Sequence, residues 1–318
     1  MASNELKNKI TVVTGAASGI GAAISKTFAA KGARLGLIDI DETAVKAAAA
    51  DMVADGMDAI GIGCDVARQA ECEAALHSII AHYGGIDVLV NNAGITQRSA
   101  FVDTKVSVYR QGMDVNFFGS LHCTKFAIAS LIERKGAIII IESLAGVAPL
   151  LGRTGYCASK HALHGLFTSL RAELIGSGVH IMIVCPGFVK TQLQTRALGG
   201  DGRVTRHPQS TVGRQDSPDR LADAVWQACE SLRETTEWMI AQNHRVRFAG
   251  AVPYLRAFAR VLGGPVHLIS ALNDRGGARE KLARFYITRL LPEHASLLAQ
   301  AQAGDVDLYS LTPEEFAS

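Results

Sequence analysis

Short apolar stretches alternate with longer stretches of helical periodicity over the first two thirds of the chain. Stretches such as ITVVT, LGLID, IDVLV and AIIII are almost continuously apolar. Strands of this kind are typical of parallel sheets that are covered by helices on both faces. The pattern predicts strands at 10–14, 35–39, 60–64, 86–91, 137–143, 179–185 and 237–241.

Helical patterns separate these strands, at 19–31, 42–55, 67–83, 105–133, 157–176 and 218–232. Strand–helix alternation implies βαβ units with right-handed crossovers. We therefore predict an α/β fold, a doubly wound (Rossmann) parallel sheet of about seven strands with helices on both faces. The Gly- and Pro-containing residues 192–216 predict a long loop. We assign residues 1–244 to this domain and 245–318 to a helical C-terminal extension, with two or three helices in 251–303.

The stretch TGAASGIG, residues 14–21, lies between the first predicted strand and the first predicted helix. Its three glycines, Gly15, Gly19 and Gly21, leave the backbone open to close approach. In such a fold this turn binds the diphosphate of a dinucleotide, because the helix N-terminus offers free N–H groups and a positive dipole. The TGxxxGxG spacing differs from the commoner GxGxxG. The prediction of a dinucleotide site therefore depends on the position of the loop between a strand and a helix.

Asp39 ends the second predicted strand. A carboxylate there can bind both hydroxyls of an adenosine ribose and repels a 2′-phosphate. This favours NAD over its phosphorylated form. The alternative is that Asp39 caps the next helix, a role that Asp41 also fits.

Tyr156 and Lys160 are four residues apart, so on a helix they share one face. A tyrosine with its ordinary pKa of about 10 is a poor acid–base group, and a nearby ammonium lowers that pKa. Ser143 lies at the end of a buried strand, where ligands bind in open α/β sheets. Its hydroxyl can hold a carbonyl oxygen while Tyr156 supplies the proton. The alternative for Tyr156 and Lys160 is an exposed helix pair.

Over about residues 6–240 the chain resembles the short-chain dehydrogenase/reductase family, in the subfamily with TGxxxGxG and YxxxK motifs. The matching residues are Thr14-Gly15, Gly19-Ile20-Gly21, Asp39, Cys64-Asp65-Val66, Asn91-Asn92-Ala93-Gly94, Asn116, Ser143, Tyr156, Lys160 and Pro186-Gly187. The stretches YCASKHALHGLFTSLRAEL and VCPGFVKT also resemble the steroid- and retinoid-oxidising branch, although such helices are generic.

The resemblance implies a role for each matching residue. Tyr156 is implied as the general acid/base, Ser143 as the group that orients the substrate, and Lys160 as the ribose ligand that lowers the pKa of the tyrosine. Asn116 is implied to hold a water in a proton relay. The resemblance also implies transfer of the pro-S hydride and a set of cofactor-binding positions: Gly15, Ser18, Gly19, Ile20, Gly21, Asp39, Asp65, Val66, Asn92, Ala93, Gly94, Tyr156, Lys160, Pro186, Gly187, Val189 and Thr191.

The function expected from these residues is NAD-dependent hydride transfer between a nicotinamide and a secondary alcohol or ketone. Two alternatives stay open, a same-fold epimerase or dehydratase and a non-catalytic dinucleotide-sensing protein. Arg153 is the only charge expected near the substrate, which predicts an apolar or ringed substrate. The expected lining is Ile95, Leu144, Val147, Leu150, Leu151 and Phe188, which alternatively pack only on one another.

Three residues depart from the family pattern or follow its motif. Glu142 precedes Ser143 where a small or hydroxylated residue is common, and we expect it to point away from the site or else to tune it electrostatically. His161 and His164 follow Lys160 on the same helix, and we expect them to be packing or surface residues.

Composition limits the partners. A net charge of +2 gives no case for nucleic acid, and no Cys/His cluster has metal-ligand spacing. The six cysteines predict buried, reduced thiols in a cytoplasmic protein, and the N-terminal MASNELKNKI lacks a signal-peptide core. By resemblance we expect a homodimer or homotetramer. The amphipathic stretch AVPYLRAFARVL predicts an active-site cap, a subunit interface or, least favoured, a membrane-surface contact.

Overall fold

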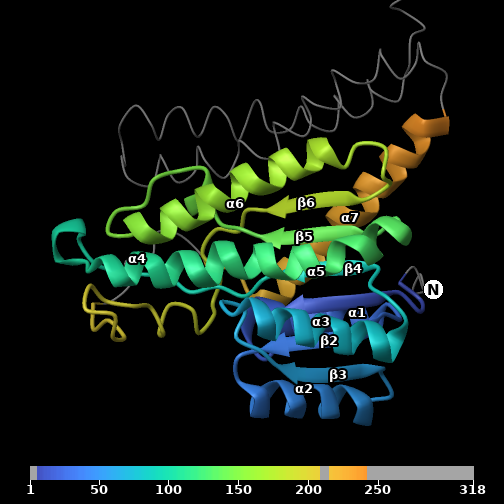
Figure 1. Ribbon diagram of the computed structural model, residues 1–318, viewed down its shortest axis with the longest axis horizontal. Helices are drawn as coiled ribbons and strands as arrows, with labels where there is room; N and C mark the ends of the chain where they lie inside the picture. Colours follow the sequence, from blue (N-terminus) through green and yellow to red (C-terminus); the bar gives the residue numbers. More distant parts are fainter. Residues whose placement is uncertain (1–5, 208–214, 242–318) are drawn as a thin grey trace, which may run out of the picture. The chain divides into compact units, whose positions relative to one another are not determined.

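The computed structural model describes residues 6–207 and 215–241, with side chains as far as residue 229. Its described part contains one parallel sheet of six strands in the order β3-β2-β1-β4-β5-β6 (Figure 1). The strands are β1 (Ile10–Thr14), β2 (Arg34–Asp39), β3 (Ala59–Gly63), β4 (Val88–Asn91), β5 (Ala137–Ile141) and β6 (His180–Val184).

Strand β1 is the point at which the strand order reverses. It pairs with β2 on one side, Val13 opposite Leu37, and with β4 on the other, Val13 opposite Val90. The connections that leave β1 and β4 therefore run to opposite sides of the sheet. In open α/β sheets a crevice for ligands opens at this point, at the carboxyl ends of the strands.

Helices cover both faces of this sheet (Figure 1). The chain contains α1 (Gly19–Ala30), α2 (Glu42–Ala54), α3 (Gln69–Tyr83), α4 (Val106–Met113), α5 (Gly119–Glu133), α6 (Thr154–Glu173) and α7 (Pro218–Ala241). Helices α3, α5 and α6 lie on the near face in Figure 1. Helix α1 lies on the other face, where Phe28 meets Trp226 of α7 edge to face at 5.9 Å.

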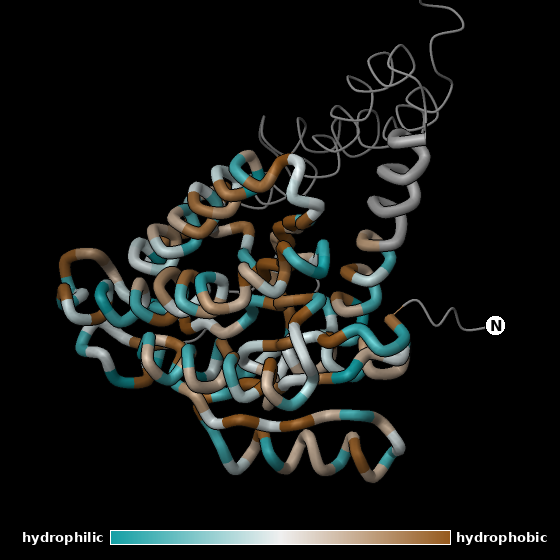
Figure 2. The backbone as a smooth tube through the Cα atoms, turned by 45° about the vertical axis from the view of Figure 1, so that its right-hand side comes forward, coloured by the Kyte–Doolittle hydropathy of each residue, from teal (hydrophilic) through white to brown (hydrophobic). Residues whose placement is uncertain are grey.

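Apolar strands form the core between these layers. Val12, Leu35, Leu37 and Leu89 are fully buried, and Figure 2 shows hydrophobic stretches gathered in the strands with mixed colours along the helices. Two compact units divide the chain after Trp226, and in the second the structure describes only the rest of α7.

A π-helical turn, Asp114–Phe118, joins α4 to α5. The resulting helix, Val106–Glu133, has the length and the mean hydropathy, 1.2, of a membrane span. Its apolar residues Cys123, Ala127 and Leu131 are fully buried in the core of this domain. Packing against the sheet therefore accounts for the apolar character of α5.

The predicted strands 10–14, 35–39, 60–64, 86–91, 137–143 and 179–185 are confirmed to within two residues at each end. The predicted strand 237–241 is wrong, because α7 continues through it to Ala241. A short apolar run cannot be told from a helix segment by periodicity alone, and no Gly or Pro separates it from the helix that begins at Pro218. The helices predicted in 251–303 and the stretch AVPYLRAFARVL lie outside the described residues.

At the amino end of β4 the buried carboxylate of Asp87 has a complete set of partners. It accepts hydrogen bonds from Arg134 Nη2 at 3.0 Å, the Ile10 backbone N–H at 2.9 Å and Lys9 Nζ at 3.1 Å. Burial alone raises the pKa of a carboxyl group, but these donors outweigh it and hold the pKa of Asp87 below its usual value. The buried negative charge at this edge of the sheet is therefore compensated by cationic and backbone donors of the protein itself.

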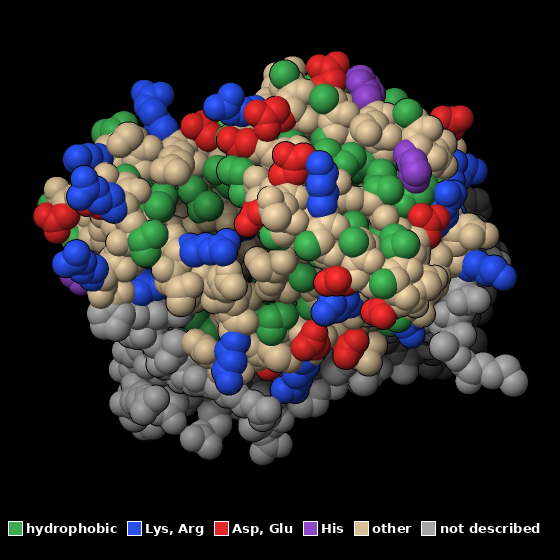
Figure 3. Space-filling model, turned by 90° about the horizontal axis from the view of Figure 1, so that it is seen from below, with side chains coloured by type: hydrophobic (Ala, Val, Ile, Leu, Met, Phe, Trp, Pro, Cys, Tyr) green, Lys and Arg blue, Asp and Glu red, His purple; other side chains and the backbone are tan. Residues whose placement is uncertain are grey.

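Basic and acidic side chains are mixed on the face seen in Figure 3. Exposed ion pairs among the described residues include Arg34 with Asp58 at 2.8 Å and Lys46 with Glu42. Because charges of both signs are interspersed, the face in Figure 3 carries no extended positive or negative patch.

Candidate active site

The glycine loop runs from the end of β1 into α1. Gly15 and Gly19 adopt left-handed backbone angles, with φ of +65° and +58°. A Cβ at Gly15 would lie 2.9 Å from Asn92 Nδ2, and one at Gly21 would overlap the Gly15 carbonyl oxygen. The loop thus requires glycine at these positions both for its conformation and for its close packing.

Side chains from β1 and the end of β4 hold this loop in place. Asn92 Nδ2 donates to the carbonyl oxygens of Thr14 and Gly15 at 2.9 and 3.1 Å. Thr14 Oγ1 accepts from the backbone N–H groups of Asn92 and Ala93, both at 3.0 Å. Asn92 and Ala93, predicted to bind the cofactor, therefore hold the glycine loop in position through hydrogen bonds to Thr14 and Gly15.

The N-terminus of α1 is open to an anion. Its N-cap, Ser18, makes no side-chain hydrogen bond to the helix, and the first turn contains no acidic residue. The free N–H groups and the positive end of the helix dipole at Gly19, Ile20 and Gly21 therefore fit a diphosphate.

The Asp39 carboxylate points toward the same loop. Its Oδ2 accepts from the Ala17 N–H at 3.0 Å and its Oδ1 from the Asp41 N–H at 3.1 Å. Asp41, not Asp39, caps α2, by accepting from the Ala44 N–H at 3.0 Å. An ionised carboxylate has about four acceptor positions, so Asp39 retains capacity for the hydroxyls of a ribose.

Asp65 and Val66 follow β3 at the same edge of the sheet. Asp65 Oδ1 accepts from the Ala67 N–H at 3.0 Å. The Val66 side chain is buried and occupies the space in which Gly119 of α5 lacks a Cβ.

Asn116 lies in the π turn and is fully buried. Its Nδ2 donates to Ser159 Oγ at 2.8 Å and to the Ile95 carbonyl at 3.0 Å, while its Oδ1 accepts from the Ile95 N–H at 2.8 Å. A Cβ on Gly94 would lie 3.1 Å from that Oδ1 and 3.8 Å from Lys160 Nζ. Asn116 thus fixes the chain after β4 beside the lysine.

Ser143 and Tyr156 meet where β5 leads into α6. Ser143 Oγ accepts from the Ala145 N–H at 3.1 Å and hydrogen-bonds the phenol of Tyr156. Helix α6 begins at Thr154, three residues earlier than predicted, so Tyr156 and Lys160 both belong to its first turns. Both are buried, which excludes the alternative of an exposed helix pair.

The charge state of Tyr156 differs from the sequence prediction. Burial raises the pKa of this phenol, and the opposing effects of the Ser143 hydrogen bond and the Arg153 charge are smaller. Lys160 is nearby, with Nζ 5.9 Å from the centre of the phenol ring, but its ammonium donates to the Ile141 carbonyl at 2.9 Å. The predicted lowering of the tyrosine pKa by Lys160 is therefore wrong for this structure.

Lys160 and Glu142 are both buried beside the end of β5. Burial lowers the pKa of Lys160 to about 8, partly offset by the negative charge of Glu142. Glu142 accepts from Cys185 Sγ at 2.8 Å and contacts His164 Nδ1 at 3.1 Å. Glu142 acts on Tyr156 and Lys160 through its charge, so the structure supports the electrostatic alternative.

The two histidines of α6 differ. His161 is exposed and its Nδ1 lies 2.9 Å from the Cys157 carbonyl, as expected for a surface residue. His164 is partly exposed and connects Glu142 to the surface of α6.

The segment after β6 lies opposite the glycine loop. The Pro186 carbonyl accepts from the Leu144 N–H at 3.1 Å, which joins the segment to β5, and Val189 is buried. A Cβ on Gly19 would lie 3.3 Å from Thr191 Cγ2. Gly187 is exposed, with its nearest neighbour in Leu144.

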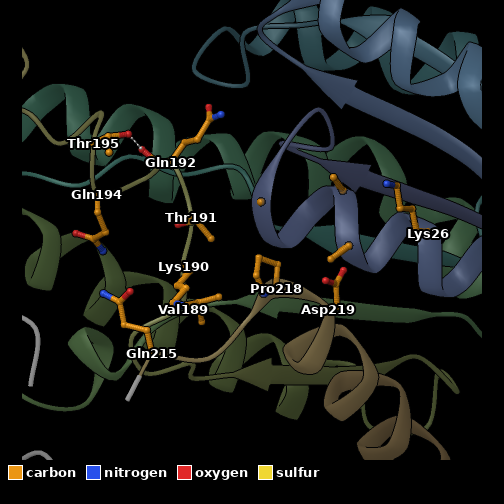
Figure 4. A pocket seen from close by; sticks show the side chains of 13 residues that line it. Lys26, Val189, Lys190, Thr191, Gln192, Gln194, Thr195, Gln215, Pro218 and Asp219 are labelled. Carbon is orange, nitrogen blue, oxygen red and sulfur yellow. Dashed lines mark hydrogen bonds between the residues drawn. The ribbon is translucent and has the colours of Figure 1, made fainter. Parts of the chain in front are cut away.

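A pocket of about 600 Å³ opens between α1 and this segment. Figure 4 shows its walls: Lys26 on α1, Val189 to Thr195 on the opposite side, and Pro218 and Asp219 at the start of α7. Three of its lining residues, Gly19, Val189 and Thr191, were predicted as cofactor-binding residues. Four others belong to no motif and come together only through the fold, so the sequence gives no signal for them: Lys26, Gln194, Gln215 and Asp219.

The predicted apolar lining is only partly in place. Leu144 is buried beside Ser143, but Val147 is exposed and Leu151 is fully exposed. Ile95, Leu150 and Phe188 are half-buried. A second cation, Arg98, lies beside Arg153, because its charge lowers the pKa of Arg153 further than burial alone does. The expectation of Arg153 as the only charge here is therefore wrong.

None of the six cysteines, all of which lie in the described residues, forms a disulfide bond. Cys64, Cys72 and Cys123 are buried, as predicted, whereas Cys157, Cys185 and Cys229 are half-buried. Within residues 6–207 and 215–241 no group of His, Cys, Asp and Glu could hold a metal ion.

Two family profiles match the chain. Residues 9–199 match the short chain dehydrogenase family, and residues 205–312 match a family described as acetyl-CoA dehydrogenase C-terminal like. The chain therefore belongs to the short-chain dehydrogenase family and is an oxidoreductase of that family.

Individual relatives agree. The chain is 32% identical over 284 residues to dehydrogenase/reductase SDR family member 7B of Xenopus tropicalis, with 87% of this chain and 88% of that protein covered. It is 35% identical to 2-(S)-hydroxypropyl-CoM dehydrogenase 3 of Xanthobacter autotrophicus, with 70% and 90% covered.

Solved structures show the same fold. A short-chain dehydrogenase/reductase from Burkholderia phymatum in complex with NAD matches with a TM-score of 0.64 at 24% identity, covering 71% of this chain and 87% of that one. An alcohol dehydrogenase from Thermococcus sibiricus complexed with 5-hydroxy-NADP matches with a TM-score of 0.62 at 23% identity, covering 70% and 90%.

Proposed function

We propose that the chain is an NAD-dependent oxidoreductase that transfers a hydride between a nicotinamide and a secondary alcohol or ketone. The observation that carries this proposal is the meeting of Ser143, Tyr156 and Lys160 at the carboxyl edge of the sheet. The same edge bears the open N-terminus of α1. The structural neighbours, which were solved with NAD and with 5-hydroxy-NADP, support a nicotinamide dinucleotide as the cofactor class.

Ser143, Tyr156 and Lys160 each have a separate role in this reaction. When bound, NAD supplies the carbon that accepts or donates the hydride. The Ser143 hydroxyl holds the substrate oxygen beside the Tyr156 phenol, which gives or takes the proton. The Lys160 ammonium, which donates to the Ile141 carbonyl at 2.9 Å, would bind the ribose of the nicotinamide beside the phenol.

The pKa of Tyr156 bears on the direction of the reaction. Burial raises this pKa, so the phenol is neutral near pH 7. A neutral phenol donates a proton to a carbonyl oxygen, whereas alcohol oxidation needs the phenolate. We therefore propose that ketone reduction predominates near neutral pH and that oxidation accelerates as the pH rises.

Asp39 supports NAD over NADP. Its carboxylate is held against the glycine loop by the Ala17 and Asp41 N–H groups. A 2′-phosphate placed there would meet a negative charge, whereas ribose hydroxyls would find an acceptor.

We also propose a cytoplasmic homodimer or homotetramer that forms through the helix 106–133. Phe118 and Ile132 are large apolar residues of that helix that remain exposed in the single chain. Exposed apolar side chains on one element are consistent with an interface. Sedimentation equilibrium of the purified chain tests the assembly, and a monomer at micromolar concentration contradicts it.

The catalytic proposal is tested with ketones and NADH, followed by the absorbance of the reduced nicotinamide. Tyr156→Phe is expected to lower kcat by at least about a hundredfold, because it removes the proton donor. NADH affinity stays within about twofold, since the glycine loop is untouched. Tyr83→Phe, a remote variant that also loses a phenol, retains turnover. Full turnover by Tyr156→Phe would contradict the assignment.

A further inference from the structure

Arg153 is a buried guanidinium at the N-terminal boundary of α6. Only 8% of the residue is exposed. Its Nη1 donates to Thr96 Oγ1 at 2.6 Å and its Nη2 to Gln194 Oε1 at 3.0 Å. Both partners are neutral, and no carboxylate of the described residues lies within ion-pair distance of it. A buried charge without a counter-charge is strongly disfavoured.

Arg98, from the loop after β4, lies at the same place. Its Nη2 donates to the Gln194 carbonyl at 2.8 Å and lies 3.4 Å from Gln194 Oε1. Its Nη1 donates to the His207 carbonyl, and its buried Nε has no partner in the described part of the chain. The two guanidinium groups therefore share one neutral amide oxygen and leave one buried donor unused.

This pair of arginines adjoins the catalytic residues. Arg153 precedes Tyr156 by three residues, and its charge acts on the phenol. Gln194, which bridges the two arginines, lines the pocket that also contains Thr191 and Gly19 (Figure 4). A group that took the place of the Gln194 side-chain oxygen would lie between two cations, of which Arg153 acts electrostatically on Tyr156.

We propose that Arg98 and Arg153 bind an oxyanion of the substrate, a carboxylate or a sulfonate carried by the same molecule as the reacting ketone or alcohol. Guanidinium groups suit this task, because their N–H donors match the geometry of such anions. The oxyanion replaces Gln194 Oε1 as the shared acceptor and neutralises the buried charge. This inference rests on the proposed function and narrows its substrate class to alcohols and ketones that carry an anionic group, in place of the apolar substrate expected from the sequence.

The competing explanation is purely structural. The arginines then serve only to hold residues 194–207 against the loop after β4. That role predicts equal effects on charged and neutral substrates, whereas an anion site predicts a change in their ratio.

The test uses two keto acids and their methyl esters, 4-oxopentanoate and 5-oxohexanoate, with NADH. The wild-type chain is expected to prefer at least one acid over its ester by about tenfold or more in kcat/KM. Arg153→Met and Arg98→Met bring that ratio to near one, and Arg153→Lys restores part of it. Arg203→Met, which removes an exposed arginine of the same segment, keeps the wild-type ratio.

A binding measurement separates this inference from the proposed function. Butanesulfonate is titrated calorimetrically into the wild-type chain and into Arg98→Met and Arg153→Met. Binding that either variant abolishes supports the site, even if no ketone in the panel is reduced. Wild-type turnover of esters and acids at equal rates, or no butanesulfonate binding in wild type, overturns it. Turnover of the esters but not of the acids would support the proposed function and contradict the anion site.

Discussion

The two edges of the sheet differ in how far the protein itself compensates the buried charges there. At the amino edge, Asp87 has two cationic partners and a backbone N–H. At the carboxyl edge, Glu142 has only His164 and Cys185, and Arg153 has only neutral partners among the described residues. Compensated charges stabilise a fold, whereas uncompensated ones cluster at sites where a ligand completes them. The comparison places stability at one edge and function at the other.

The largest effect is expected at Asp87. Asp87→Asn lowers the free energy of unfolding at pH 7 by about 3 kcal/mol, because the buried amide keeps only one acceptor oxygen for three donors and no negative charge for Lys9 and Arg134. The pKa of Asp87 is lowered in the folded state, so its contribution exists above the unfolded pKa and disappears as the pH falls through the folded one. Urea titrations at pH 7 and pH 3 measure this. A variant as stable as wild type at pH 7 would break the comparison.

At the other edge, removing a charge is expected to stabilise the chain. Lys160→Met raises the free energy of unfolding of the cofactor-free protein at pH 7 by about 2 kcal/mol, since the pKa of about 8 in the folded state lies below the ordinary lysine value of 10.5. The unfolded state binds more protons between these values, so wild-type stability gains from this group as the pH rises and the difference shrinks toward pH 10. The variant loses turnover.

Lys46→Met is the matched control for this measurement. Lys46 is an exposed lysine on α2 whose side chain pairs with Glu42. Exposed pairs contribute little, so the control changes stability by less than about 0.5 kcal/mol. Denaturant titrations of both variants at pH 7 and pH 10 provide the data. Destabilisation by Lys160→Met would show that its bond to Ile141 outweighs its desolvation.

Glu142→Gln gives the smallest expected effect and sharpens the electrostatic comparison. The charge of Glu142 opposes the lowering of the Lys160 pKa by burial. Its removal lowers that pKa further, and the alkaline limb of kcat/KM for NADH moves to lower pH, while activity at pH 6 stays within about twofold. An unchanged profile would mean that Glu142 only fills space. His161→Gln, on the exposed side of α6, is the control.

The sheet and the glycine loop could be predicted from sequence because their signals are local. Buried parallel strands are apolar throughout, and the missing side chains at Gly15 and Gly21 reflect contacts within a few residues or with one neighbouring strand. Helix α7 was predicted less well, because an apolar run of only four residues fits either type of element.

The catalytic set was predictable as identities but not as electrostatics. The four-residue spacing of Tyr156 and Lys160 identifies them in the sequence. Whether burial or a neighbouring charge dominates the pKa of Tyr156 depends on distances that the sequence does not contain. Arg98 carried no signal at all, because it meets Arg153 only through the packing of the loop after β4 on the start of α6. Charges brought together by tertiary contacts are the part that the sequence could not supply.

The π turn at Asp114–Phe118 separates the orientations of the two helices that it joins. Its wider turn rotates the residues beyond it about the helix axis, relative to a regular α-helix. Helix α5 can therefore keep Cys123, Ala127 and Leu131 in the core, while the Tyr109 hydroxyl of α4 lies 2.8 Å from Thr154 Oγ1 at the start of α6. One local departure from α-helical geometry thus lets a single apolar helix serve both the core and the helix that bears Tyr156.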